Sequence, residues 1–330
     1  MRHMQQHSRW FFAATCALVS ACAALRHVEP RGVLPATETW TAAPPMPHAR
    51  SSHAVVATSD ALYVIGGTGD GGKPVLAVDR FDGISWREVT RLPGDGINAP
   101  VAAAVRDRIY VIGGFKTSTN IPTNEVLVYD LRTNAWSSAA PLAEPRGGDA
   151  AAVLNGRIHV IGGGNSQRTL ANHSEYDPVT NTWTERASLS RSKGSPGAVV
   201  LEGKLYSIGG RSGPSDYGEV EVYDPATDRW TAGPPIPARG TAGATLYCGT
   251  IFVFGGESQA TNSTLDEVLR LNESRTGWER SRPMPEARNY ARAVQWRGAV
   301  YLIGGNSTVE NAHEARGSTL VERFAAQCAA

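Results

Sequence analysis

The chain has 330 residues, of which 41% are hydrophobic and 19% are charged, and it contains 35 glycines. Its 32 Lys and Arg residues nearly balance 31 Asp and Glu residues, which gives a formal net charge of +1 at pH 7. This balance argues against DNA or RNA as a partner, because nucleic-acid binding requires a basic surface. The length suffices for one globular domain that needs neither disulfides nor metals to fold.

The first 22 residues have the composition of a signal peptide. Arg2 and Arg9 form a short basic region, and residues 10–21 form an apolar stretch. Such a stretch has the length of a signal-peptide core and is too short to span a bilayer stably. We therefore expect an exported protein, located in the periplasm or the cell envelope.

The residues around Cys22 suggest how this leader is processed. The sequence Val-Ser-Ala at 19–21 resembles the bacterial lipobox, whose cysteine is acylated and becomes the mature N-terminus. The resemblance implies lipidation at Cys22, an outer-membrane lipoprotein because Ala23 follows, and membrane contact through this anchor only. Ordinary cleavage, which would release a soluble protein, is the alternative. Residues 23–36 would be a linker.

Two markers then repeat with one period along the rest of the chain. Gly-Gly pairs that close apolar runs recur at intervals of 46 to 49 residues, at Gly66-Gly67, Gly113-Gly114, Gly162-Gly163, Gly209-Gly210, Gly255-Gly256 and Gly304-Gly305. Tryptophans recur at intervals of 46 to 50 residues, at Trp40, Trp86, Trp136, Trp183, Trp230 and Trp278. A period near fifty with β-type content is typical of a propeller blade of four strands.

Each repeat begins with an apolar stretch, a two-residue turn and a second apolar stretch that ends in the Gly pair. Turn pairs such as Asn155-Gly156 and Glu202-Gly203 suit the positive φ of tight hairpins. A third strand follows after a variable loop, and the tryptophan opens a fourth. This pattern resembles the kelch repeat over residues 37–325. The resemblance implies an all-β fold, a six-bladed kelch β-propeller.

The ends of the chain predict how the ring closes. The last repeat has no tryptophan after its third strand, whereas Trp40 precedes the first Gly pair. We therefore expect an N-terminal strand to complete the last blade, which removes an open sheet edge. Residues 326–330 would be a short tail. It contains Cys328, which either forms a disulfide with Cys248 or stays a free thiol.

Basic residues stand 16 positions before five of the six Gly pairs. Before the remaining pair, Gly113-Gly114, this position is Ile97. Ring symmetry puts these positions on one circle at the channel mouth, so we expect a cationic collar that binds an anionic ligand. The alternative is that each basic side chain braces its own loop. Three residues further on, His53 and Asp149 are the two polar members of a second circle, and we expect His53 to contact the ligand together with the collar residues. The expected collar residues are Arg50, Arg146, Lys193, Arg239 and Arg288.

The fold leaves the activity open, since many unrelated functions share it. We expect an exported recognition scaffold that binds a protein or a glycan through the loop face around the channel. The alternative is a sugar-active enzyme of the N-acetylneuraminate epimerase (mutarotase) type, with Asp149 and Glu257 as candidate catalytic acids. A galactose-oxidase-like oxidoreductase has less support, because Cys248 has no set of copper-ligand partners around it. The sequence has no spacing of metal ligands, and we expect no metal and no cofactor.

Overall fold

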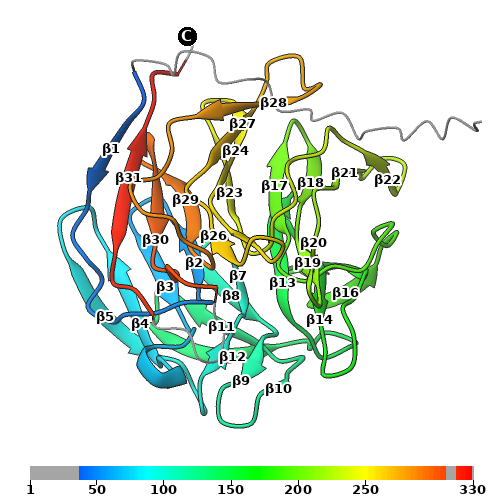
Figure 1. Ribbon diagram of the computed structural model, residues 1–330. Coiled ribbons are helices and arrows are strands. Elements are labelled where there is room, and N and C mark those ends of the chain that lie inside the picture. The colour runs from blue at the N-terminus through cyan, green and yellow to red at the C-terminus, as the bar shows by residue number, and fades with distance from the viewer. Residues whose placement is uncertain (1–36, 310–316, 329–330) are drawn as a thin grey trace, which may run out of the picture.

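In the computed structural model, the described residues, 37–309 and 317–328, form six four-stranded antiparallel sheets arranged around a common centre (Figure 1). This is the all-β, six-bladed kelch propeller that the repeats predict. The signal peptide, Cys22 and the linker lie outside the described residues. No helix in ranges 37–309 and 317–328 is long and apolar enough to cross a membrane.

In blades 1 to 5 the four strands follow one another outward from the channel in chain order, and in blade 6 the N-terminal strand takes the outermost place. Blade 1 consists of β2 (Ala54–Ala57), β3 (Leu62–Ile65), β4 (Ala77–Phe81) and β5 (Trp86–Arg91). Blade 2 consists of β7 (Val101–Val105), β8 (Arg108–Ile112), β11 (Val126–Asp130) and β12 (Ala135–Ala139). Blade 3 consists of β13 (Gly147–Leu154), β14 (Arg157–Gly164), β15 (His173–Asp177) and β16 (Thr182–Glu185). Blade 4 consists of β17 (Gly197–Leu201), β18 (Lys204–Ile208), β21 (Val220–Asp224) and β22 (Arg229–Ala232). Blade 5 consists of β23 (Gly243–Tyr247), β24 (Thr250–Phe254), β27 (Val268–Leu271) and β28 (Trp278–Ser281). Blade 6 consists of β29 (Arg292–Trp296), β30 (Ala299–Ile303), β31 (Val321–Ala325) and β1 (Thr39–Ala42).

A 3-10 helix and several two-residue strands lie on the face of the ring where the second strand of each blade ends. They are the 3-10 helix Asp70–Gly72 and the strands β6 (Ile97–Asn98), β9 (Phe115–Lys116), β10 (Ile121–Pro122), β19 (Arg211–Ser212), β20 (Ser215–Asp216), β25 (Glu257–Ser258) and β26 (Ser263–Thr264). We call this side of the ring, with the loops that follow the Gly pairs, the loop face.

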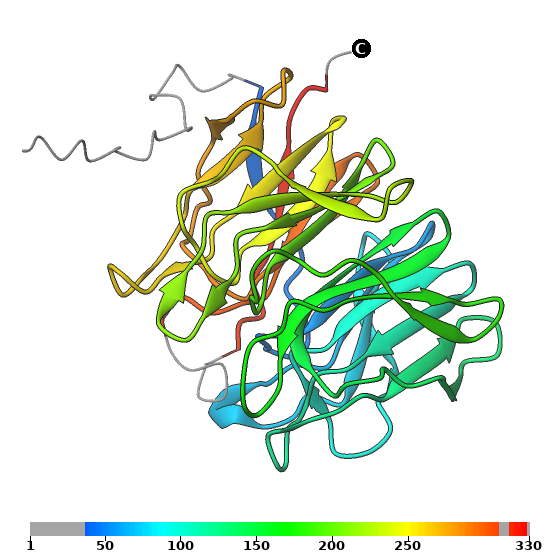
Figure 2. The same cartoon turned by 90° about the vertical axis from the view of Figure 1, so that its right-hand side faces the viewer.

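The N-terminal strand β1 is the outer strand of blade 6. It pairs antiparallel with β31, with Thr39 opposite Ala325 and Ala42 opposite Glu322. Figures 1 and 2 both show the two strands side by side, although they come from opposite ends of the chain. One blade is therefore built from both ends of the described sequence.

The hairpin turns have the backbone geometry expected from their residues. Asn155 and Gly156 have φ of 53° and 75°, and Glu202 and Gly203 have φ of 50° and 74°. Two consecutive left-handed residues form the turn that suits the twist of a two-residue hairpin. The predicted hairpin of the first two strands in these blades is confirmed.

The repeated glycines and tryptophans join neighbouring elements. A Cβ on Gly67, whose φ is +85°, would lie 2.4 Å from the carbonyl oxygen of Ser51, so a side chain has no room there. Trp183 donates its indole N–H to the Ala140 carbonyl of blade 2, and Trp230 donates to the Ala187 carbonyl of blade 3. Each of these tryptophans therefore links its own blade to the preceding one.

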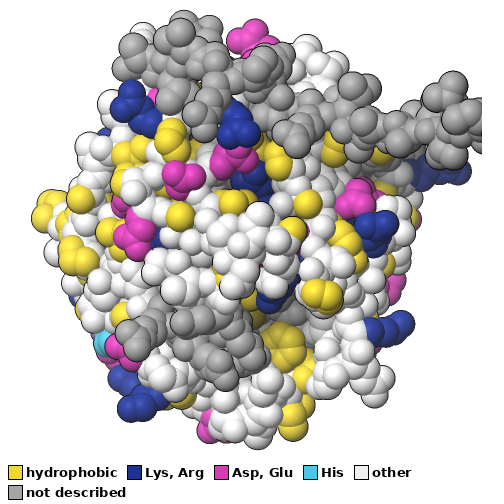
Figure 3. All heavy atoms as spheres, viewed as in Figure 1, with side chains coloured by type: hydrophobic (Ala, Val, Ile, Leu, Met, Phe, Trp, Pro, Cys, Tyr) yellow, Lys and Arg dark blue, Asp and Glu magenta, His cyan; other side chains and the backbone are white. Residues whose placement is uncertain are grey.

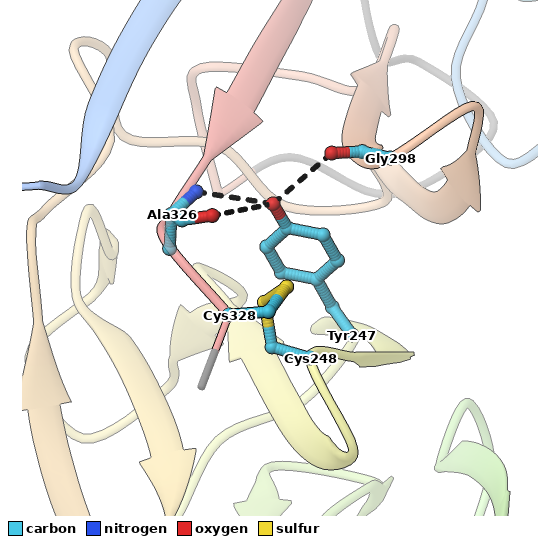
Figure 4. Close-up of a disulfide and its surroundings, with 5 residues drawn as sticks. All are labelled: Tyr247, Cys248, Gly298, Ala326 and Cys328. Atoms are coloured by element: carbon cyan, nitrogen blue, oxygen red, sulfur yellow. Dashed lines mark hydrogen bonds between the residues drawn. A yellow bond between two sulfur atoms is a disulfide. The ribbon is translucent and has the colours of Figure 1, made fainter. Parts of the chain in front are cut away.

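A disulfide links the end of the chain to blade 5 (Figure 4). Cys248, in the turn between β23 and β24, is bonded to Cys328, and their Cα atoms lie 4.9 Å apart. The hydroxyl of neighbouring Tyr247 donates to the carbonyl of Ala326 or Gly298 and accepts from the Ala326 amide, each at 3.1 Å. The disulfide, which the sequence left open, is formed in the structure.

Candidate functional site

Six residues with left-handed backbone surround the end of the channel at the loop face. They stand two positions after the collar residues, have φ between 49° and 62°, and are Ser52, Ala99, Gly148, Ser195, Thr241 and Tyr290. Several amides in this circle donate to the carbonyl of the preceding blade, as from Ala99 to Ser52 at 2.8 Å and from Gly148 to Ala99 at 3.0 Å. We call this circle the mouth. Its backbone hydrogen bonds join blades 1 to 4 in sequence and blade 5 to blade 6.

The collar residues lie just outside the mouth, but their side chains point into the blades. Arg50, Arg146, Lys193, Arg239 and Arg288 have at most 1% of their surface exposed. Arg50 donates to the carbonyl of Gly66 at 3.1 Å, and Arg288 donates to that of Gly304 at 2.9 Å. These carbonyls belong to the Gly pairs, so the basic side chains fix the corner where each second strand ends.

Most of these buried cations have an acidic partner on the third strand of the same blade or, for Glu267, one residue before it. The pairs are Arg50 with Asp79 at 2.5 Å, Lys193 with Glu221 at 3.0 Å, Arg239 with Glu267, and Arg288 with Glu322. Burial lowers the pKa of Arg50 to about 10, and the charge of Asp79 opposes this effect. A buried charge is tolerated only when it is paired. The side chains thus have the geometry of the bracing alternative, and the expected cationic collar facing a ligand is not present at these positions.

Blade 3 departs from this pattern. Arg146 donates to the Ser174 hydroxyl at 3.0 Å, and its nearest carboxylate oxygen is that of Asp149 at 3.6 Å. Asp149 is fully buried, and neither of its oxygens has a hydrogen-bond partner within the described residues. Burial raises the pKa of Asp149 to about 7, against the opposing charge of Arg146. The predicted Arg146–Asp149 pair therefore exists, and its acid titrates near neutrality.

His53 occupies the equivalent position in blade 1 and is also fully buried. Burial, with smaller effects from the charges of Arg50 and Arg292, lowers the pKa of His53 well below its usual range. The imidazole is therefore neutral at physiological pH. His53 packs next to Gly304 of blade 6, where a Cβ would lie 2.6 Å from the ring, and so serves the contact between blades.

A connected polar cluster lies at the mouth between blades 4, 5 and 6. The buried carboxylate of Glu257 accepts a hydrogen bond from Arg211 and another from the side-chain amide of Asn289, both at 2.5 Å. Arg211 also donates to the Tyr290 hydroxyl at 2.6 Å. We call Arg211, Glu257, Asn289 and Tyr290 the mouth cluster. Its charges balance, and it presents hydrogen-bonding groups at the loop face.

Arg211 is the member of this cluster that reaches solvent, with 28% of its side chain exposed. Burial raises the pKa of Tyr290 to about 12, so its hydroxyl keeps its proton. The arginine is held by an acid on one side and a phenol on the other, which fixes its orientation. The fixed guanidinium can bind a carbonyl, a hydroxyl or a carboxylate of a ligand.

The sequence pointed to Glu257 in this cluster, but not to Asn289 or Tyr290. Both follow collar residue Arg288. The position of Asn289 is serine, asparagine or glycine in the other repeats, and that of Tyr290 is serine, alanine, glycine or threonine. Comparison of the six repeats would have singled out Tyr290, the one aromatic side chain at its position, but not Asn289, whose counterpart in blade 2 is Asn98. Within the described chain, no hydrogen bond or ion pair joins Glu257 to Asp149, the other predicted acid.

Charges of both signs are mixed over the surface. On the face shown in Figure 3, Lys and Arg side chains alternate with Asp and Glu side chains. In the part of the chain that the structure covers, no group of three or more His, Cys, Asp or Glu residues is placed to hold a metal ion.

Comparison with known families gives two matches. Residues 34–197 match the KLHDC2/KLHL20/DRC7 Kelch-repeats domain, and residues 193–237 match the Kelch motif. The two segments overlap at residues 193–197 and together cover the first four blades.

Similar proteins include kelch proteins and enzymes. The chain is 33% identical over 130 residues to Kelch-like protein 35 of Mus musculus, which is 39% of this chain and 21% of that protein. It is 31% identical over 132 residues to N-acetylneuraminate epimerase of Pasteurella multocida, which is 38% of this chain and 34% of the enzyme. The matches thus span about a third or less of these relatives.

A solved structure described as that of YjhT resembles the whole propeller. It matches with a TM-score of 0.73 and 18% identity, over 84% of this chain and 95% of that one. At this identity the likeness is one of fold.

Proposed function

Since the chain belongs to the kelch-repeat family, we propose that it is a recognition scaffold that binds a protein or a glycan through the loop face. The mouth cluster supports this proposal. It joins loops of three blades around one partly exposed guanidinium, Arg211, which offers oriented donors to a ligand.

The collar residues enter this proposal as supports and not as ligand contacts. Their side chains are buried and most are paired with acids, so they add little long-range attraction for an anion. We therefore expect the ligand to be recognised mainly by hydrogen bonds at the mouth. An anionic group on the ligand would bind to Arg211.

A photo-crosslinking residue at Thr261 tests the proposal for a protein ligand. Thr261 is exposed in the loop between β25 and β26, beside the mouth cluster, whereas Val179 is exposed at the opposite end of blade 3. We expect a crosslinked partner from position 261 and none from position 179. The crosslink should be lost in Arg211→Ala and kept in Arg132→Ala, a control whose arginine pairs with Asp107 on the opposite face.

A glycan ligand is tested by thermal shift of the same purified variants with N-acetylneuraminate and N-acetylglucosamine. A rise in melting temperature that Arg211→Ala abolishes would support a sugar site at the mouth. Equal results for Arg211→Ala and Arg132→Ala, in both crosslinking and thermal shift, would refute the proposed site.

A second candidate function is a sugar-active enzyme of the epimerase type. Asp149 favours it, because an acid with a pKa near 7 can exchange protons at physiological pH, and one relative is named N-acetylneuraminate epimerase. Magnetisation-transfer NMR of N-acetylneuraminate anomers tests this candidate. Exchange at the uncatalysed rate in the presence of the protein would exclude it.

We also propose that the chain is exported and, through Cys22, lipid-anchored. The Cys248–Cys328 disulfide supports export, because disulfides persist in oxidising compartments. Mass spectrometry of the mature N-terminus would distinguish an acylated Cys22 from ordinary cleavage.

A further inference from the structure

A cavity of about 110 Å³ lies inside the central channel, next to the mouth. All six innermost strands contribute to its wall, with small side chains such as Ala54, Ala102, Ala150, Ala198 and Ala244. It begins at Pro100, Pro196 and Ala242, each one residue beyond the mouth. This volume is smaller than the 300–1,000 Å³ or so of pockets that take drug-sized ligands.

Arg292, at the start of β29, is the one charged residue in the wall of this cavity. The equivalent residue of each other blade, which also pairs with the residue before the Gly pair, is Ala54, Val101, Ala150, Gly197 or Gly243. A long cationic side chain at this place therefore has no packing role that the repeat requires.

The guanidinium of Arg292 is only partly used by the protein. Its Nε donates to the carbonyl of His53 at 2.8 Å, and this is its one hydrogen bond within the described residues. A guanidinium has five N–H donors and stays charged, so four remain for another partner. Burial lowers the pKa of Arg292, and the charge of Asp149 opposes this effect.

The wall adds further donors. Each innermost strand has a sheet neighbour on one side only, so the N–H groups of its other edge face the channel. Because most of the lining side chains are alanine, glycine or proline, little covers these groups. The cavity thus combines one fixed cation with backbone donors, inside a space from which large ligands are excluded.

We propose that Arg292 holds a small monovalent anion, a halide or a short carboxylate such as acetate, in the channel cavity. The bound anion would neutralise a guanidinium that the blades otherwise leave incompletely paired. Backbone hydrogen bonds at the mouth narrow the way in from the loop face. A wider section of about 350 Å³, lined by Ala57, Ala104 and Val153 among others, adjoins this cavity on the side away from the mouth and shares wall residues with it.

Crystals of the full chain grown in sodium bromide test this site. We expect an anomalous bromide peak in contact with the Arg292 guanidinium. In solution, sodium bromide and sodium acetate at constant ionic strength should raise the melting temperature, and Arg292→Gln should weaken the apparent affinity about tenfold or more. Arg297→Gln is the matched control, since Arg297 lies outside the cavity and donates to the carbonyls of Asp82 and Asp60.

The two salts distinguish the sources of the anion. A larger rise with acetate assigns the site to a short carboxylate, and a larger rise with bromide assigns it to a halide. Absence of bromide density at Arg292, or an unchanged salt effect in Arg292→Gln, would overturn the proposal. If Arg292→Gln does not fold, Arg292→Lys serves instead, and its lost guanidinium geometry should still weaken binding.

Discussion

The basic residues near the mouth show how a buried charge is accommodated one residue at a time. Arg239 reaches Glu267, 28 positions later, and Arg50 reaches Asp79, 29 positions later. In blade 2 the basic residue is replaced by Ile97, and Glu125 pairs with Lys116 on its own loop. A cation and an acid therefore occur together in these blades, because removing one partner leaves the other charge buried and unpaired.

Among the acids near the mouth, Asp149 is the one least completely paired with a cation. Its titration should therefore change the stability of the protein measurably with pH. Its pKa is raised from 3.8 to about 7 by burial in the folded protein. Between these pH values the folded state keeps a proton that the unfolded state has released, so the free energy of unfolding decreases as pH rises from about 4 to 7. Asp149→Asn should remove this decrease, and the variant should be more stable than the wild type at pH 8 by up to about 4 kcal/mol.

Urea unfolding at pH 5 and pH 8 checks this expectation, with Asp70→Asn as an exposed control. The control should follow the wild type at both pH values. A variant Asp149→Asn with the same pH dependence as the wild type would show that Asp149 is ionised in the fold throughout this range.

The sequence predicted the positions of the site better than the directions of its side chains. The period of the repeat placed Arg50 and Arg239 on one circle, but a period does not reveal whether a side chain turns toward the channel or into its blade. The acid 28 or 29 residues later decides this question, since its carboxylate binds the guanidinium inside the blade. The sequence predicted no role for Arg292 or Tyr290. Each differs from the residues at its position in the other repeats, and the prediction relied on residues that the repeats share.

At the scale of strands, blade 3 contains a polar pair in the core that separates it from blade 4. His159 on β14 and His173 on β15 share a hydrogen bond of 2.8 Å and are nearly or fully buried. The His173 ring packs edge-on against Tyr223 of blade 4, with centroids 4.5 Å apart. Glu175 lies 3.5 Å from the other side of His159 and is bound by Arg186.

This pair should make the protein sensitive to acid. Burial lowers the pKa of both imidazoles below the usual 6.5, and Glu175 opposes the effect at His159. As pH falls below 6.5 the unfolded chain binds protons that the folded blades exclude, so the free energy of unfolding decreases. His173→Phe keeps a ring in place but removes one titrating group. At pH 7.5 the free energy of unfolding of this variant should be about 1 kcal/mol below that of the wild type, because the hydrogen bond between the two histidines is lost. Between pH 7.5 and pH 5 its free energy of unfolding should decrease by less than that of the wild type.

Chemical unfolding of wild type and His173→Phe at pH 7.5 and pH 5 separates the two effects. The loss at pH 7.5 measures the hydrogen bond, and the change between the two pH values measures the titration. An identical change in both proteins would mean that His173 does not contribute to acid sensitivity.

At the scale of the whole molecule, the ring architecture followed from the sequence because every blade repeats the same markers. Gly67 and its counterparts end the second strands, and tryptophans such as Trp183 and Trp230 bind the preceding blade. The loops after the Gly pairs differ in length and residues between repeats, so no period constrains them. The mouth cluster takes Arg211 and Glu257 from these loops and Asn289 and Tyr290 from the segment before β29, so its contacts required the structure.

The two ends of the described sequence meet in blade 6, and the disulfide anchors the segment that follows β31. β31 pairs with β1 on one side and with β30 on the other, and Cys328 follows it by three residues. The bond joins residues 80 positions apart. Replacing both cysteines, Cys248→Ser with Cys328→Ser, should lower the free energy of unfolding by about 2–4 kcal/mol, because the unfolded chain regains the freedom of a long loop.

Calorimetry with and without dithiothreitol distinguishes this loss from a local defect at the turn. The reductant should lower the melting temperature of the wild type toward that of the double variant and should leave the variant unchanged. Tyr247 still holds Ala326 in the variant, so the fold should persist in a single, cooperative transition. A wild type that melts at the same temperature in both conditions would show that β31 is secured by its strand pairing alone, with the disulfide adding nothing to the closure of the ring.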